Sequence, residues 1–171
     1  MTYDIGSDGG EAGRETDAVV RYAILGPVRA ARGTDELDLG PPKRLALFAL
    51  LVLRAPGPLT LSEAIDVLWD DEPPASAVNV VHRHIGALRR TLEPQLRSRS
   101  DARHLVRAAD GYRLLVDTSN SDLLHFRDLC AQARLAARAG DPARAAHRFV
   151  EALRLWRGPV VADGSLVCRH P

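Results

Sequence analysis

The segment 76–92, SAVNVVHRHIGALRRTL, constrains the fold most, because it has the pattern of a helix with two faces of opposite character. Its apolar residues recur at the spacing of one helical face, at Val78, Val81, Ile85, Leu88 and Leu92. At about 100° per residue, the opposite face carries Ser76, Asn79, Arg83 and Arg90. We therefore expect one side of this helix in a core and the other side open to a partner.

The open side has side chains suited to the DNA major groove. Arginine can hold guanine through two hydrogen bonds, and asparagine can hold adenine in the same way. Gly86 and Ala87 are too small to keep that side away from a partner, and His82 and Arg89 complete the DNA-binding candidates of this helix. The alternative is a solvated face whose arginines only keep it soluble, and the helix alone leaves both interpretations open.

Charge and length narrow the choice of partner. The net charge is only +1, but residues 76–116 carry eight arginines and three acids, a local excess of +5 that favours phosphate binding. The 171 residues suit one ordinary domain or two small ones. No apolar run approaches the roughly 20 residues that span a bilayer. The acidic start is unlike a secretory signal. We expect a cytoplasmic, nucleoid-associated protein with no membrane partner.

The first part of the chain predicts a small antiparallel sheet on a core helix. Residues 1–18 have the composition of a disordered tail. Residues 19–26, 28–32 and 37–40 read as three short strands with a turn near Gly33. The run 42–55 is apolar over most of a helix circumference. Lys43 and Arg44 in its first turn are either ordinary surface charge or contacts to the DNA backbone.

A helix-turn-helix with a wing is predicted next. Thr60 and Glu63 form a capping box at the start of a helix over 60–71, with Leu61, Ile65 and Leu68 inward. Pro73 and Pro74 separate it from the helix over 76–92, which would read the groove.

The turn Asp110-Gly111 lies between alternating apolar runs and predicts a hairpin over 104–116, the wing, with Tyr112 in the core. Arg107 and Arg113 on this wing are candidates for contacts to phosphates or the minor groove.

Two helices of a tetratricopeptide-like hairpin are predicted over 121–157. The first buries one face, made of Leu123, Phe126, Leu129, Cys130, Ala133 and Ala137. Gly140 ends it and Asp141-Pro142 starts the second, which buries Ala145, Phe149, Leu153 and Trp156. Repeats of this type normally need three or more copies to bury a continuous core. A single pair must therefore pack on the winged helix, dimerise or remain marginally stable.

This order of elements resembles a known family of regulators. The motifs LGPPKRLALFALLVLRA, IDVLWDDEPPASAVNVVHRHIGALRRTL and DGYRLLVD are similar to the OmpR-type winged helix of the Streptomyces antibiotic regulatory protein (SARP) family. Residues 121–162 resemble the start of that family's bacterial transcriptional activation domain. The fold is then α+β, a winged helix-turn-helix over 19–117 with an N-terminal antiparallel sheet, three helices and a hairpin wing. The α-helical hairpin and an irregular tail over 163–171 follow it.

The resemblance implies a transcriptional activator of antibiotic biosynthesis genes. Its partners would be the direct repeats of double-stranded promoter DNA, RNA polymerase and a second copy of the chain, with no catalytic residues, cofactor or metal. The chain departs from the family at Gly86 and Ala87, where the family often has a polar residue and an arginine, and in ADGSLVCRHP, where the family continues with further helices. The rival interpretation is a protein-interaction module that works through the α-helical hairpin without specific DNA binding.

Overall fold

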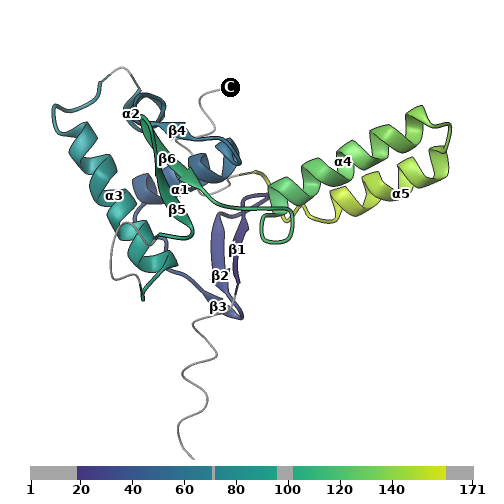
Figure 1. Cartoon of the computed structure of the whole chain (residues 1–171), viewed down its shortest axis with the longest axis horizontal. Helices are drawn as coiled ribbons and strands as arrows, with labels where there is room; N and C mark the ends of the chain where they lie inside the picture. The colour runs from purple at the N-terminus through teal and green to yellow at the C-terminus, as the bar shows by residue number, and fades with distance from the viewer. Residues whose placement is uncertain (1–18, 71, 96–101, 161–171) are drawn as a thin grey trace, which may run out of the picture.

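The computed structural model describes residues 19–70, 72–95 and 102–160. The predicted tails over 1–18 and 163–171 lie outside these residues. The elements in chain order are β1 (Val20–Ala23), β2 (Arg29–Arg32), β3 (Asp35–Glu36), α1 (Pro42–Arg54), β4 (Leu59–Thr60), α2 (Leu61–Trp69), α3 (Ala77–Leu92), β5 (Leu105–Ala108), β6 (Gly111–Leu114), α4 (Asp122–Arg138) and α5 (Pro142–Leu153). Figure 1 shows α3 at one end of the molecule and the α4–α5 hairpin projecting from the other.

The N-terminal sheet is antiparallel with strand order β1-β2-β3. The prediction of its third strand over 37–40 is wrong, because β3 covers only Asp35 and Glu36. Gly33, at φ 60°, reverses the chain so tightly that pairing resumes at Asp35, opposite Arg32. The chain then leaves the sheet, and Leu39 enters the core.

Helix α1 is the centre of the core, as its apolar circumference predicts. It buries a continuous run of seven residues: Ala46, Leu47, Phe48, Ala49, Leu50, Leu51 and Val52. The ring of Tyr22 from β1 packs against Phe48, with 5.9 Å between ring centroids. The sheet, α2 and α3 all join this core cluster, which holds α3 by one face only.

The capping box at the start of α2 is confirmed. Thr60 Oγ1 accepts a hydrogen bond from Glu63 N at 3.2 Å, and Glu63 Oε2 accepts one from Thr60 N at 3.0 Å. The helix ends at Trp69 and not near residue 71, because Asp70 takes a left-handed backbone at φ 52°. Leu68 is fully buried, whereas Leu61 and Ile65, predicted inward, are only half-buried at the edge of the core.

A second sheet, of order β4-β6-β5, carries the predicted wing. The hairpin over 104–116 is confirmed as β5 and β6, and Tyr112 is 8% exposed, so its predicted place in the core is correct. The strand β4 was not predicted; Leu59 pairs with Tyr112 and Thr60 with Gly111. A Cβ on Gly111 would overlap the carbonyl oxygen of Leu59 and lie 2.7 Å from the Cα of Thr60, so β4 can approach only because this residue is glycine.

The α4–α5 hairpin is held together mainly by alanines. The buried residues between its helices are Leu129, Ala133, Ala136, Ala145 and Ala152. The predicted helix faces are partly wrong: Ala137 is exposed and Ala136 is buried in its place. Three residues that were predicted to be buried are exposed instead: Phe149 by 39%, Leu153 by 64% and Trp156 by 42%. The alanines between the two helices cover only one edge of the wide apolar side of α5, so these larger side chains stay at the surface.

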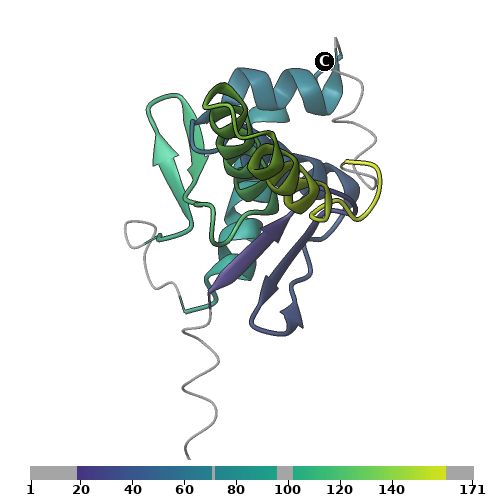
Figure 2. The same ribbon diagram turned by 90° about the vertical axis from the view of Figure 1, so that its right-hand side faces the viewer.

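The base of the hairpin is joined to β1 and to the two residues that follow it. Tyr22 N in β1 donates to Asn120 O just before α4, and a carboxylate at the start of α4, which we call the Asp122 joint, holds Ile24 and Leu25. The oxygens of Asp122 accept hydrogen bonds from Ile24 N and Leu25 N at 3.0 Å and lie 3.2 Å from Arg157 Nη2. Arg157 N in turn donates to Leu25 O at 2.8 Å, so both ends of the hairpin meet at the same two residues. In Figure 2 the hairpin points toward the viewer, in front of the winged helix. None of the described helices has the length and apolar character needed to span a membrane.

Replacing Gly111 by alanine should destabilise the protein by about 1–3 kcal/mol, because the new methyl group forces β4 away from β6. Thermal unfolding followed by circular dichroism would show a Tm lower by about 5 °C or more. Gly86→Ala is the matched control. Its Cβ would lie 3.8 Å from the nearest atom, in a helix interior, and should stabilise by about 0.5–1 kcal/mol. An unchanged Tm for Gly111→Ala would contradict the steric argument.

Candidate nucleic-acid interface

Helix α3 has the two faces that the sequence predicts, with one correction. Its buried residues are Ala77, Val81, Ile85, Leu88 and Leu92. Val78 was predicted in this stripe but is 43% exposed. It lies about 60° from Val81 around the helix, on the side away from α1, and Ala77 fills the first position of the stripe instead.

The outward face of α3 carries the predicted polar residues. Ser76, Asn79, Arg83 and Arg90 are all exposed. The helix has three arginines, two histidines and no aspartate or glutamate. Among the described residues, no hydrogen bond or ion pair engages Arg83 or Arg90, so both guanidinium groups are available to an outside partner. We call Asn79, Arg83 and Arg90 the outward face below.

The side of α3 that faces α1 lies near two basic residues in the first turn of α1, Lys43 and Arg44, of which Lys43 is already engaged. Lys43 Nζ donates to Leu68 O at 2.7 Å, at the end of α2, and lies 4.4 Å from the centroid of the Trp69 ring. The Nε of Arg44 is buried and has no hydrogen-bond partner among the described residues. Burial lowers the pKa of His84, and the charges of Arg44, Arg83 and Lys43 lower it further, so this ring is neutral at pH 7.

The opposite flank of α3 packs on the wing. Arg89 Nε donates to Leu105 O at 2.8 Å, and its guanidinium carbon lies 5.5 Å from the centroid of the Tyr112 ring. The ring of His82 meets the same tyrosine edge-on, with 6.1 Å between centroids. His82 and Arg89 therefore lie at the junction of helix and wing and not on the outward face.

The two arginines of the wing are both exposed but lie on opposite sides of the hairpin. Arg107 pairs with Tyr112 across the strands, whereas Arg113 pairs with Val106. Directly opposite residues in an antiparallel pair point to the same face. Because Tyr112 contacts α3, Arg107 shares the face turned toward α3, and Arg113 lies on the face turned away from it.

The far end of α3 is held by residues that the sequence analysis did not identify. Arg32 Nη2 from β2 donates to the carbonyl oxygens of Leu92 at 2.8 Å and Thr91 at 3.4 Å, capping the last turn of the helix. The carboxylate of Glu93 accepts hydrogen bonds from the backbone of Arg103 and His104, where the wing begins. Neither pairing has a local sequence signal, because the partners are backbone groups far away in the chain.

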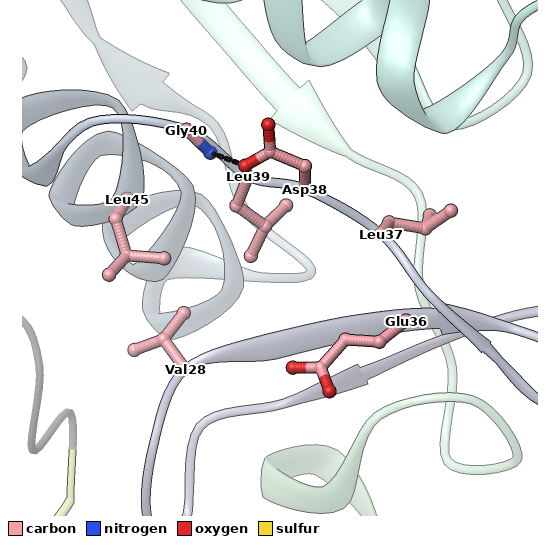
Figure 3. A pocket seen from close by; sticks show the side chains of 7 residues that line it. All are labelled: Val28, Glu36, Leu37, Asp38, Leu39, Gly40 and Leu45. Atoms are coloured by element: carbon pink, nitrogen blue, oxygen red, sulfur yellow. Dashed lines mark hydrogen bonds between the residues drawn. The ribbon is translucent and has the colours of Figure 1, made fainter.

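One surface groove lies apart from α3, between the N-terminal sheet and α1 (Figure 3). It has a volume of about 350 Å³, and its walls combine four apolar side chains with two carboxylates: Val28, Leu37, Leu39, Leu45, Glu36 and Asp38. One oxygen of Asp38 accepts a hydrogen bond from Gly40 N at 2.8 Å. The acidic rim makes this groove unsuited to DNA phosphates. The described residues include no group of three ligands that could hold a metal ion.

Comparisons with known proteins agree with this architecture. The family described as bacterial transcriptional activator domain matches residues 121–170. The regulatory protein AfsR of Streptomyces coelicolor is 36% identical over 152 residues, which cover 88% of this chain and 14% of AfsR. The regulatory protein DnrI of Streptomyces peucetius is 32% identical over 143 residues, covering 82% of this chain and 53% of DnrI. The predicted resemblance to the Streptomyces antibiotic regulatory protein family is confirmed, because regulators of that family match most of this chain.

A solved structure of another relative confirms the fold. Mycobacterium tuberculosis EmbR, in complex with a low affinity phosphopeptide, superposes with a TM-score of 0.73 at 30% identity, over 85% of this chain and 38% of that one. The predicted α+β winged helix with a following helical hairpin is therefore correct. The chain spans about half the length, or less, of these relatives. The domain bounds 19–117 and 121–162 stay a prediction, as do the DNA contacts of individual residues.

Proposed function

We propose that this chain is a DNA-binding transcriptional regulator that reads the major groove with α3. The observation that supports this most is the outward face, where an asparagine and two arginines stand exposed on a helix without any acid. Asn79 and Arg83 are four residues apart and so lie one turn apart on the same side. The major groove is about 12 Å wide, enough to admit a helix whose outer side chains reach base edges.

The arrangement around α3 fits this use. Helix α3 lies at the end of the molecule opposite the α4–α5 hairpin, so the hairpin does not obstruct a duplex that approaches α3 (Figure 1). The wing stands beside α3 and turns Arg107 toward it. In this arrangement α3 would contact bases in the groove, and the wing would contact the DNA backbone from an adjacent surface. The base contacts would give sequence specificity, and the backbone contacts would fix the register of the protein on the duplex.

We propose further that the chain activates antibiotic biosynthesis genes by binding direct repeats in their promoters and contacting RNA polymerase, without catalysing a reaction. The names of its relatives as regulatory proteins support the regulatory part of this proposal. The test is a footprint of the purified protein on the promoters that neighbour its own gene. Protection of paired sites there is the expected result, and a uniform cleavage pattern at saturating protein would contradict it.

The competing proposal is a protein-interaction module that uses the hairpin alone, favoured by the exposed Phe149, Leu153 and Trp156. Salt dependence separates the two. Affinity for DNA falls steeply between low and moderate salt, because each phosphate contact releases counterions. Binding through an apolar surface lacks this dependence and survives the same increase in salt.

Arg83→Ala should weaken binding to the specific site by about 1–3 kcal/mol, the range for losing a base-edge contact, and weaken nonspecific binding much less. Titration of labelled specific and scrambled duplexes at one salt concentration measures both. Arg134→Ala removes an equally exposed arginine from α4, on the far side of the molecule, and should change neither. Equal losses on both duplexes for Arg83→Ala would make it a phosphate contact instead.

Arg107→Ala should lower affinity for all sequences alike and reduce the slope of log affinity against log salt by about one unit, as expected for a lost phosphate contact. Arg113→Ala is the matched comparison on the same hairpin. Because it lies on the face turned away from α3, its slope should change less. Two unchanged slopes would show that the wing does not touch DNA, and a larger change for Arg113→Ala would reverse the proposed orientation.

We also propose that the exposed apolar side chains of α5, Phe149 and Leu153, pair with a second copy of the chain. The resulting dimer would match two half-sites of a repeat. Phe149→Asp should give a monomer in sedimentation that still binds one half-site but loses cooperative binding to the repeat. Leu135→Asp is the control, because Leu135 is 64% exposed but lies about 200° from the buried Ala133, on another side of the hairpin. A wild-type monomer at high micromolar concentration without cooperativity would refute the pairing.

A further inference from the structure

Arg89 and Arg90 are neighbours on α3 with opposite surroundings. Arg90 is exposed and makes no hydrogen bond or ion pair within the described part of the chain. Arg89 is half-buried on the flank toward the wing and makes two contacts with it. In the sequence the two arginines look equivalent. On the helix their side chains point about 100° apart, so they reach different partners.

The first contact of Arg89 completes a sheet edge. Its Nε donates at 2.8 Å to the carbonyl oxygen of Leu105, in β5. β5 is an edge strand of the order β4-β6-β5, so no further strand of the described residues supplies a donor on that side. A hydrogen bond from a charged donor to a backbone carbonyl is stronger than a neutral one. The guanidinium therefore takes the place of a neighbouring strand and fixes the base of β5 to α3.

The second contact of Arg89 is with the ring of Tyr112 in β6, 5.5 Å from the guanidinium carbon to the ring centroid. Tyr112 pairs across the hairpin with Arg107, and His82 of α3 touches the same ring from another side. Arg89 thus contacts both strands of the wing. One of the residues that it contacts, Tyr112, lies directly across the hairpin from Arg107, the arginine that faces α3.

We propose that Arg89 is a positioning residue: it fixes the wing against α3, sets where Arg107 meets the DNA backbone, and makes no contact with DNA itself. This rests on the proposed function, since a wing must touch DNA for its position to affect binding. The Nε of Arg89 is occupied by Leu105 O and its guanidinium carbon lies near the Tyr112 ring, whereas Arg90 and Arg107 are exposed.

The test compares Arg89→Met with Arg90→Met. Methionine keeps an apolar stem of similar length but removes the hydrogen bond and the ring contact. In the protein without DNA, backbone amides of 105–114 should exchange with solvent faster in Arg89→Met, and the resonances of Tyr112 should shift. Arg90→Met should leave both unchanged. Arg89→Lys keeps the charge without the planar group and should restore the wing only in part, so it serves as the second variant if the methionine form does not fold.

DNA binding supplies the second measurement. If Arg89 acts through the wing, Arg107→Ala should cost clearly less affinity in the Arg89→Met background than in the wild type, with a coupling of about threefold or more, as for residues that share a partner. If Arg89 touches phosphate directly, the two changes multiply and each removes about one unit of salt slope, which overturns the proposal. Unchanged amide exchange in Arg89→Met overturns it as well. Should the wild type bind no DNA, the proposed function fails, while the amide exchange still decides whether Arg89 holds the wing.

Discussion

The packing of four apolar residues of α3 onto the core around α1 is the interaction on which the remaining structure depends. Val81, Ile85 and Leu88 are buried against the core. The 3.6-residue period of the helix alone then places Asn79, Arg83 and Arg90 on the outward side. The burial of these side chains stabilises the protein, and the same rotation presents the polar face. A substitution that shifts the stripe would therefore change the exposed surface and the stability together.

Basic residues divide into two groups in this protein, and the division follows from their backbone surroundings. Arg32, Lys43 and Arg89 donate to carbonyl oxygens at the end of α3, the end of α2 and the edge of β5. These carbonyls are acceptors that helix ends and sheet edges leave without intrinsic partners. Arg83, Arg90 and Arg107 make no such bond within the described residues and are exposed on α3 and the wing. Arg89 and these exposed arginines count alike in the net charge over 76–116, which cannot separate them.

The sequence predicts most of the fold because the strongest signals are local. The apolar circumference of α1, the capping box of Thr60 and Glu63, and the Asp110-Gly111 turn each depend on residues within one or two turns of chain. The strand β4 was missed because its partners, Gly111 and Tyr112, lie far along the chain. The strand β3 was misplaced because the turn at Gly33 is tighter than the sequence pattern indicates, so pairing with β2 resumes already at Asp35. The same limit applies to the candidate site. The exposed face was predictable from helical period, but the contacts of Lys43 and Arg89 were not, since their partners are carbonyl groups that every residue carries.

The Asp122 joint has a mechanical consequence. Both ends of the α4–α5 hairpin are fastened at Ile24 and Leu25, so the hairpin is mounted as a cantilever and not as a span between two supports. A cantilever passes a bending load on its tip to its root as torque. Here the root is β1, whose Tyr22 hydroxyl is hydrogen-bonded to His104 Nδ1 at 2.8 Å, where the wing begins. A force applied near Gly140 would thus be carried at the base of the hairpin by β1 and, through Arg127, by the carbonyl oxygens of Leu53 and Ala55 at the end of α1.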